Sequence, residues 1–262
     1  SNTPKQIVVY NALGFEVPKF YHVPMINNPE GKKLSKRDGA MDVMDYKNLG
    51  YLPEALLNFL VRLGWSNGDQ EIFSMEEMLE LFDPSNINKS ASAYNAEKLL
   101  WLNSEYIKAV SNDRLIEELK FFNLDLSHHP KRTELLDLAK QRAQTILELK
   151  KSVTDIIDIP NSYDEAGVKK FVKEDTKDFL EKYLILLEQN KESLYDVSKI
   201  EEITKPFINE NGLKFPQLFQ PIRIALTGGT QAPSVYDIIS ILGFIEVSSR
   251  LNKALKRNFQ NT

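Results

Sequence analysis

The chain has 262 residues, of which 42% are hydrophobic and 27% are charged, and its 33 basic and 37 acidic side chains leave a formal net charge of −4. This composition is typical of a globular chain with a buried core, and it excludes disordered, collagen-like and low-complexity proteins. The chain has no cysteine and three histidines. Disulfides and thiolate metal sites are therefore excluded, a reducing compartment is favoured, and no metal site is expected. No apolar stretch approaches the roughly 18 residues that a membrane-spanning helix needs.

The first 40 residues predict a short helix, an extended segment and a basic loop. The helical pattern over 7–13 stops at Gly14, and an apolar extended stretch covers 20–26. A turn over 27–31 then leads into a run of basic residues. The sequence does not start with methionine and opens inside a helical pattern, so we expect it to be a piece of a longer protein.

From residue 40 onward almost every segment predicts a helix. Pro53 begins a helix with an apolar face. Ser74 with Glu77 forms a capping box, and Ser111 caps a further helix. Leucines surround Trp101, which we therefore expect in the core.

Longer helices are predicted toward the C-terminus. Residues 133–152 are expected to form one amphipathic helix, and Pro160 breaks the chain after it. Prolines are expected to begin the helices 221–227 and 233–243, which glycines end. These patterns predict a mainly α fold with boundaries near residues 106 and 160.

Basic residues gather in three places although the chain is acidic overall. Residues 32–37 hold four, 131–151 hold six and 250–257 hold four, so that 14 of the 33 basic residues occupy 35 positions. This clustering indicates local anionic partners such as RNA. Solvated helix faces that merely collect lysines are the alternative.

The string Lys33-Leu34-Ser35-Lys36-Arg37 has the chemistry of a polyphosphate-binding loop. It follows an extended segment and a glycine turn, so it can place several cations and a hydroxyl donor around phosphate groups. Cations that meet the charge developing on a reacting phosphate lower the barrier electrostatically. An exposed basic turn without a ligand is the alternative for so short a string.

This string and its context resemble the signature loop of class I aminoacyl-tRNA synthetases, in the form typical of bacterial glutamyl-tRNA synthetases. Further segments are similar to that family in the family's order along nearly the whole chain; they are 3–22, 52–56, 63–65, 97–99, 101–103, 220–223, 225–228 and 242–243. Many matching segments in one order are far more specific than the loop alone.

The resemblance implies that the chain is the C-terminal portion of such a synthetase. Residues 1–26 would be a remnant of the catalytic domain, and 27–106 would hold the signature loop and the region that contacts the tRNA stem. Residues 107–159 and 160–262 would be two helical subdomains that bind the anticodon. The implied fold class is mainly α.

The resemblance implies that the parent protein is a glutamate-tRNA ligase, which activates glutamate with ATP as glutamyl-adenylate and joins it to the 3′ end of tRNA-Glu. Lys36 would contact the ATP phosphates and assist adenylate formation, while Lys33, Leu34, Ser35 and Arg37 would form the rest of the loop. The intact enzyme would use ATP with Mg²⁺. Glutamate and ATP would bind only together with the catalytic half that this sequence lacks.

The family's His-x-Gly-His element, which completes the ATP site in a Rossmann fold, is absent from this sequence. We therefore expect the chain alone to be inactive and to carry no cofactor. The resemblance implies a cytoplasmic monomer that does not contact a membrane.

Arg142 matches the residue that reads the third anticodon base in the family. That base is C in glutamate tRNAs and G in glutamine tRNAs. The edge of C offers acceptors to a guanidinium, whereas G presents an N–H donor at the same place. An arginine here therefore favours tRNA-Glu, and a surface arginine on a solvated helix is the alternative.

Gln220, Arg223, Pro233 and Val235 match positions that surround the first two anticodon bases in the family. Ala232 and Val235 differ from the side chains that occur there in other members, which leaves the selectivity for the first base open. A proline that only begins a helix is the alternative for Pro233.

Two other functions remain open. One is a non-discriminating or glutaminyl relative, against which Arg142 and the helical C-terminal half argue, because the usual glutaminyl enzyme has a β-rich anticodon region. The other is a helical RNA-binding protein without catalytic activity.

Overall fold

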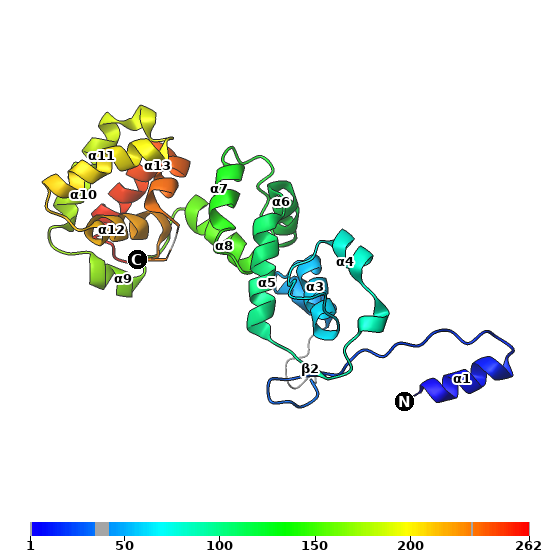
Figure 1. Ribbon diagram of the computed structural model, residues 1–262. Helices are drawn as coiled ribbons and strands as arrows, with labels where there is room; N and C mark the ends of the chain where they lie inside the picture. Colours follow the sequence, from blue (N-terminus) through cyan, green and yellow to red (C-terminus); the bar gives the residue numbers. More distant parts are fainter. Residues whose placement is uncertain (1, 35–41, 232, 262) are drawn as a thin grey trace. The chain divides into compact units, whose positions relative to one another are not determined.

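The computed structural model describes residues 2–34, 42–231 and 233–261, and the chain divides into two compact units, Ser1–Tyr106 and Ile107–Thr262. Helices form nearly all of the regular structure in the described part (Figure 1), which confirms the predicted mainly α fold. Among the described helices, none combines the length and the apolar character that crossing a membrane requires.

Unit 1 is built from short helices and one small sheet. Its elements are α1 (Thr3–Ala12), β1 (Ile26–Asn27), α2 (Val43–Asn48), α3 (Pro53–Gly64), α4 (Met75–Leu81), the 3₁₀ helix η2 (Pro84–Asn86), β2 (Ser92–Ala93) and the first part of α5 (Ala96–Ala109). The two strands pair in parallel. Pro53 begins α3, Ser74 and Glu77 form the predicted capping box of α4, and both expectations are therefore confirmed.

Buried amide side chains join the helices of unit 1. The Asn58 side chain on α3 donates to the carbonyl oxygen of Glu71 at 2.9 Å and accepts from the amide of Phe73 at 2.8 Å. Asn103 on α5 accepts from the amide of Leu52 at 2.8 Å, just before α3 begins. Because each amide has found partners, these buried polar groups hold the loops around α3 without a desolvation penalty.

Trp101 is 41% exposed, and the expectation of a core tryptophan is therefore wrong. Its neighbours Leu99 and Leu102 are buried in one apolar cluster with Leu56 and Phe59 of α3. Two residues along a helix amount to a rotation of about 200°, so Trp101 lies on the opposite face from Leu99. Proximity to leucines in sequence does not place a helical residue on their face.

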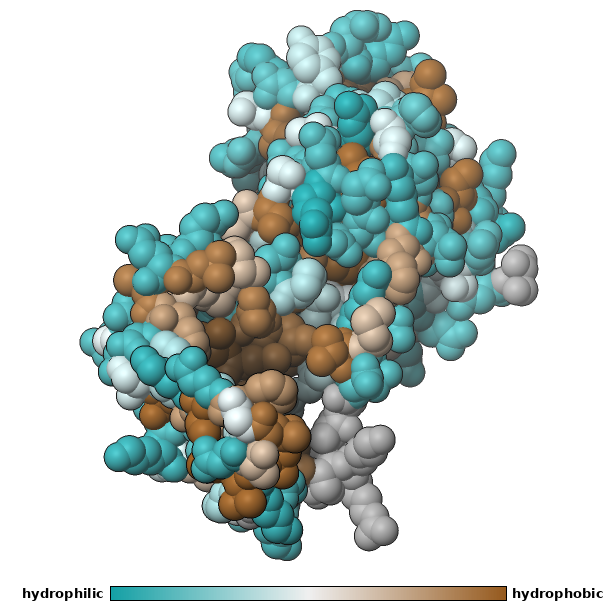
Figure 2. All heavy atoms as spheres, turned by 90° about the vertical axis from the view of Figure 1, so that its right-hand side faces the viewer, coloured by the Kyte–Doolittle hydropathy of each residue, from teal (hydrophilic) through white to brown (hydrophobic). Residues whose placement is uncertain are grey.

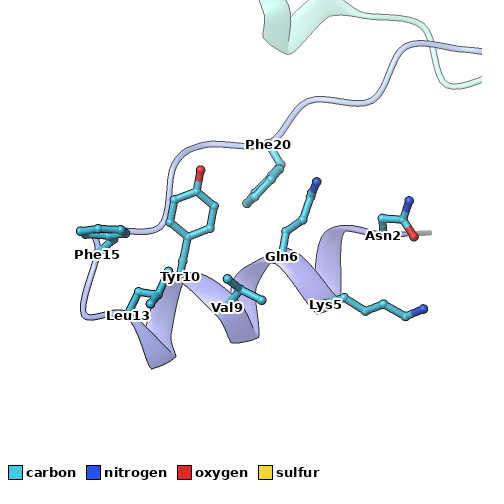
Figure 3. A pocket seen from close by; sticks show the side chains of 8 residues that line it. All are labelled: Asn2, Lys5, Gln6, Val9, Tyr10, Leu13, Phe15 and Phe20. Atoms are coloured by element: carbon cyan, nitrogen blue, oxygen red, sulfur yellow. The ribbon is translucent and has the colours of Figure 1, made fainter.

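The N-terminal part of unit 1 exposes much apolar surface. No residue of α1 is buried, and Val9, Leu13 and Phe15 are each more than half exposed. A cavity of about 670 Å³ lies over this helix, and Tyr10 and Phe20 point into the space between α1 and the chain that follows it (Figure 3). Figure 2, seen from the side on which α1 lies in Figure 1, shows apolar surface around a hollow in the lower part of this face.

The regular structure of unit 2 is helical wherever its residues are described. Its elements after α5 are α6 (Asn112–Phe121), α7 (Arg132–Ala139), α8 (Ile146–Ile157), α9 (Glu165–Phe171), α10 (Thr176–Gln189), the 3₁₀ helix η3 (Lys191–Ser193), α11 (Val197–Glu210), α12 (Phe215–Thr227) and α13 (Val235–Lys256). Ser111 caps α6 by accepting from the amide of Arg114, as predicted.

One large core runs through unit 2. It joins Leu135 of α7 and Ile156 of α8 to buried side chains of α10, α11, α12 and α13. Residues on both sides of Pro160 therefore share apolar contacts. The assignment of 1–26, 27–106, 107–159 and 160–262 to separate functional domains stays a prediction.

The predicted single helix over 133–152 is wrong, because two helices, α7 and α8, cover that range. Thr145 begins α8 as its N-cap, with its hydroxyl accepting from the amide of Glu148 at 3.2 Å. The Glu148 carboxylate accepts in return from the amide of Gln144 at 2.8 Å. This Thr-x-x-Glu signal starts a new helix, and the apolar periodicity across it hid the break.

The predicted starts of the last two helices are wrong as well. α12 begins at Phe215, so Pro221 lies inside it, where it is buried in the core. Burial among apolar neighbours offsets the hydrogen bond that this proline cannot make. α13 begins at Val235, two residues after Pro233. Gly243 has non-helical angles (φ 72°, ψ 170°) and interrupts the helix where its end was predicted, and helical residues resume after this kink as far as Lys256.

We predict that Gly228→Ala destabilises unit 2 more than Gly212→Ala. Both glycines have positive φ angles, +80° and +62°, which cost an alanine about 1–2 kcal/mol. A Cβ at Gly228 would also lie 2.8 Å from the carbonyl oxygen of Ser162, whereas a Cβ at Gly212 meets nothing within 4 Å. We therefore expect a loss of about 3 kcal/mol or more for Gly228→Ala. Urea unfolding followed by circular dichroism measures both, and equal losses would contradict the close approach.

Candidate nucleic-acid interface

A tight turn positions the entrance to the predicted phosphate-binding loop. The Asn28 side chain accepts from the amides of Glu30 at 3.1 Å and Lys32 at 2.9 Å. Gly31 supplies the positive φ angle of +81° that the turn needs. The sequence analysis recognised the turn but missed Asn28 as its organiser, although asparagine before a Pro-x-Gly string is a signal for such side-chain capping.

The chain returns along β1 after this turn. Lys33 pairs with Asn27 in an antiparallel bridge, and the amide of Leu34 donates to the carbonyl oxygen of Ile26 at 3.0 Å. Lys32 and Lys33 are both exposed at this point. The other predicted loop residues, Ser35, Lys36 and Arg37, lie outside the described residues.

The part of the chain that the structure describes holds no group of three or more histidine, aspartate or glutamate side chains that could bind a metal ion. The exposed groups near the loop entrance are lysines, which suit phosphate groups rather than Mg²⁺. These residues therefore suit phosphate groups rather than a protein-held metal.

A second cationic site lies in unit 2 around Arg223 of α12. This side chain is half-buried, its Nη2 donates to the carbonyl oxygen of Pro233 at 3.3 Å, and its buried Nε has no partner among the described residues. Burial lowers the pKa of the Arg223 guanidinium, and the charge of Arg142 lowers it further. A cation held in this state is poorly compensated by its own protein, and an anionic or hydrogen-bonding ligand would complete it.

Arg142 lies in the turn between α7 and α8, not on the continuous helix that the sequence predicted. Its side chain is exposed, and it is close enough to Arg223 for its charge to affect that guanidinium. Two arginines that are 81 positions apart in the sequence thus share one region of the surface. Both were assigned to the anticodon from the sequence, and in the fold the charge of Arg142 acts on the Arg223 guanidinium.

Gln220 lies one helical turn before Arg223 on α12, so the two side chains lie on the same face. Its buried Oε1 has no hydrogen-bond partner among the described residues. Pro233 is buried and joins this site through its carbonyl oxygen, while Val235, 3% exposed, is part of the core at the start of α13. Val235 is therefore buried and does not line an open surface.

Two family models match the chain. One, described as an anticodon binding domain, matches residues 90–255 and thus more than half of the chain. The chain belongs to this family. The second, described as the catalytic domain of class I tRNA synthetases (E and Q), matches residues 1–101.

Proteins similar to the chain include several glutamate-tRNA ligases. It is 86% identical to glutamate-tRNA ligase 1 of Aliarcobacter butzleri over 262 residues, which is 100% of this chain and 56% of that protein. It is 51% identical to glutamate-tRNA ligase 1 of Campylobacter hominis over 257 residues, which is 98% of this chain and 55% of that protein. The chain therefore spans about half the length of the curated relatives it matches.

Solved structures show the same fold. A crystal structure of a glutamate tRNA ligase from Elizabethkingia meningosepticum, in complex with its amino acid, matches with a TM-score of 0.82 at 30% identity and covers 97% of this chain and 55% of that chain. A glutamate-tRNA synthetase from Elizabethkingia anophelis matches with a TM-score of 0.74 at 30% identity. These comparisons confirm the resemblance to the C-terminal portion of glutamyl-tRNA synthetases.

Proposed function

We propose that the chain is the tRNA-binding C-terminal part of a glutamate-tRNA ligase, whose whole protein uses ATP to join glutamate to tRNA-Glu through glutamyl-adenylate. The observation that carries this proposal is the pair of arginines, Arg142 and Arg223, with the unpartnered Oε1 of Gln220 beside them on α12. They lie in a helical unit of the anticodon-binding family.

Single-stranded RNA bases are the ligand that such a site suits. Proteins read splayed bases by hydrogen bonds to their edges and by stacking on planar groups, and arginine does both. Buried polar atoms without partners are rare in folded proteins, so Arg223 Nε and Gln220 Oε1, which have no partner among the described residues, favour a ligand with both donors and acceptors. The edges of nucleobases offer both. We therefore assign Gln220 and Arg223 to the first two anticodon bases, with Pro233 and Val235 supporting them.

Arg142 is proposed to read the third anticodon base. A guanidinium can donate to the O2 and N3 acceptors of C, whereas the N–H donor of G would face it without an acceptor. A polar contact that discriminates in this way is worth about 1–3 kcal/mol, or about 5- to 160-fold in affinity. The partner that this contact selects is tRNA-Glu over tRNA-Gln.

The signature loop is proposed to serve ATP in the intact enzyme. The Asn28 turn and the Asn27–Lys33 bridge lead directly into it and support Lys33 and Leu34 at its start. Lys36 is proposed to contact the ATP phosphates, and Ser35 and Arg37 to complete the loop. ATP is a substrate here, together with Mg²⁺, and this chain supplies only cations toward it.

The working state is proposed to be a cytoplasmic monomer, as expected of the implied enzyme. Glutamate and ATP are proposed to require the catalytic half that the relatives carry beyond the length of this chain.

We predict that Arg142→Gln, in a glutamate-tRNA ligase that contains this chain, narrows the preference for tRNA-Glu transcripts with C over those with G at the third anticodon position. Glutamine donates and accepts, so it tolerates both bases. We expect the ratio of kcat/KM values to fall by about tenfold. Steady-state charging of the two transcripts measures it.

Lys131→Gln, which removes a partly exposed charge that pairs with Glu134 elsewhere in the same basic cluster, is the matched control and should leave the ratio unchanged. If Arg142→Gln also left the ratio unchanged, Arg142 would have no role at the third base. If the unaltered enzyme charged both transcripts equally, it would be a non-discriminating relative.

We predict further that the purified 262-residue chain does not catalyse glutamate-dependent exchange between ATP and pyrophosphate, because it lacks the family's His-x-Gly-His element. The same chain should still bind tRNA-Glu, with an affinity that falls steeply as salt rises. Exchange above background would contradict the first statement, and equal binding of unrelated tRNAs would contradict the second.

A further inference from the structure

Arg250 of α13 is the one basic residue of the 250–257 cluster that lies fully inside the described protein, with 1% of its surface exposed. Its Nη1 donates to the carbonyl oxygens of Ile156 at 2.9 Å and Leu226 at 2.6 Å, and its Nη2 donates to that of Ile157 at 2.9 Å. Its Nε donates to the Glu246 carboxylate at 2.7 Å. The 250–257 cluster was a candidate for phosphate contacts, but Arg250 makes its hydrogen bonds inside the protein instead.

The carbonyl groups that Arg250 binds belong to the last turns of two helices. Ile156 and Ile157 end α8, and Leu226 is the residue before the last of α12. The last four carbonyls of a helix have no partner within it, and they carry the negative end of the helix dipole. One guanidinium therefore satisfies the ends of both helices, and Glu246 balances its charge.

Of the two arginines of the proposed anticodon site, one lies on α12 and the other precedes α8. Arg223 is one turn before Leu226 on α12, and Arg142 lies in the turn between α7 and α8, before α8 begins at Ile146. α13, drawn in orange and red in Figure 1, holds both helices through Arg250, and its Lys253 donates to the carbonyl oxygen of Pro160 at 2.9 Å, just after α8. The hydrogen bonds of Arg250 and Lys253 thus fix the direction of α8 with respect to α12.

We propose that Arg250 is a positioning residue for the reading of the third anticodon base. It acts through Arg142, because the rigid twelve-residue helix α8 transmits the fixed position of its C-terminal end to the α7–α8 turn. This inference rests on the proposed function of Arg142. Arg250 itself does not contact RNA, since it is buried and its donors are engaged.

A lysine cannot replace this arginine. The guanidinium is planar and directs its donors along several lines at once, whereas an ammonium is a compact point charge at the end of a flexible stem. Arg250 uses these directions to reach two helix ends and one carboxylate. Arg250→Lys therefore keeps the charge and the apolar stem but cannot donate to the carbonyl oxygens of α8 and α12 at the same time.

The test measures binding of the 262-residue chain to two tRNA-Glu transcripts that differ only in C or G at the third anticodon position, at one fixed salt concentration. The quantity compared is the Kd of the transcript with G divided by the Kd of the transcript with C, so a high ratio means a strong preference for C. We expect Arg250→Met and Arg250→Lys to lower this ratio to within about threefold of the value for Arg142→Gln. The double variant Arg142→Gln with Arg250→Lys should have no lower ratio than Arg142→Gln alone, because both changes remove the same contact.

Tyr183→Phe is the matched control. The Tyr183 hydroxyl is buried in the same core, where it forms a 2.8 Å hydrogen bond with the Thr204 hydroxyl, but it joins α10 to α11 and touches neither α8 nor α12 by that bond. Its removal should lower the stability of unit 2 and leave the ratio of Kd values unchanged. General loosening of the core is thereby separated from loss of positioning.

The outcomes separate the two proposals. If Arg142→Gln lowers the ratio and Arg250→Lys, folded by circular dichroism, keeps the ratio of the unaltered chain, the positioning role is overturned and the proposed function stands. The same holds if Tyr183→Phe lowers the ratio as much as the Arg250 variants do. If Arg142→Gln itself leaves the ratio unchanged, the proposed reading of the third base fails, and the role of Arg250 fails with it.

Discussion

The carbonyl ends of α8 and α12 meet at one buried guanidinium, that of Arg250, and the arrangement of unit 2 depends on this contact. Helix ends inside a protein leave carbonyl groups that must find donors, and burying them unpaired would cost about 1–3 kcal/mol each. A single side chain with several fixed donors meets this need where two helices converge. The same contact keeps both helices at a set distance from α13.

The site around Arg223 differs from that of Arg250, because some of its buried polar atoms have no hydrogen-bond partner among the described residues. Arg223 keeps a buried donor and Gln220 a buried acceptor without a partner among the described residues, and the charge of Arg142 adds to that of Arg223. Such a site lowers the stability of the protein alone, and a ligand that completes the hydrogen bonds recovers the loss.

Local signals in the sequence predicted several of the helix limits. Pro53, the Ser74–Glu77 capping box and Ser111 begin helices as expected, and Gly228 ends α12 with a positive φ angle. Each signal acts through hydrogen bonds and dihedral preferences within a few residues, so no distant contact is needed to interpret it. The continuous helix over 133–152 failed because apolar periodicity was given more weight than the Thr-x-x-Glu signal that interrupts it.

The sequence by itself determined the helical class, the basic loop after a glycine turn and the residue types that can contact RNA, since composition, periodicity and short motifs are local properties. Only the tertiary structure decided that Trp101 faces outward, that Arg142 lies in a turn from which its charge acts on Arg223, and that Arg250 is buried rather than exposed to phosphates. Whether a cation serves the interior or the surface depends on which carbonyl groups and charges the fold brings to it from distant positions, and no local pattern contains that information.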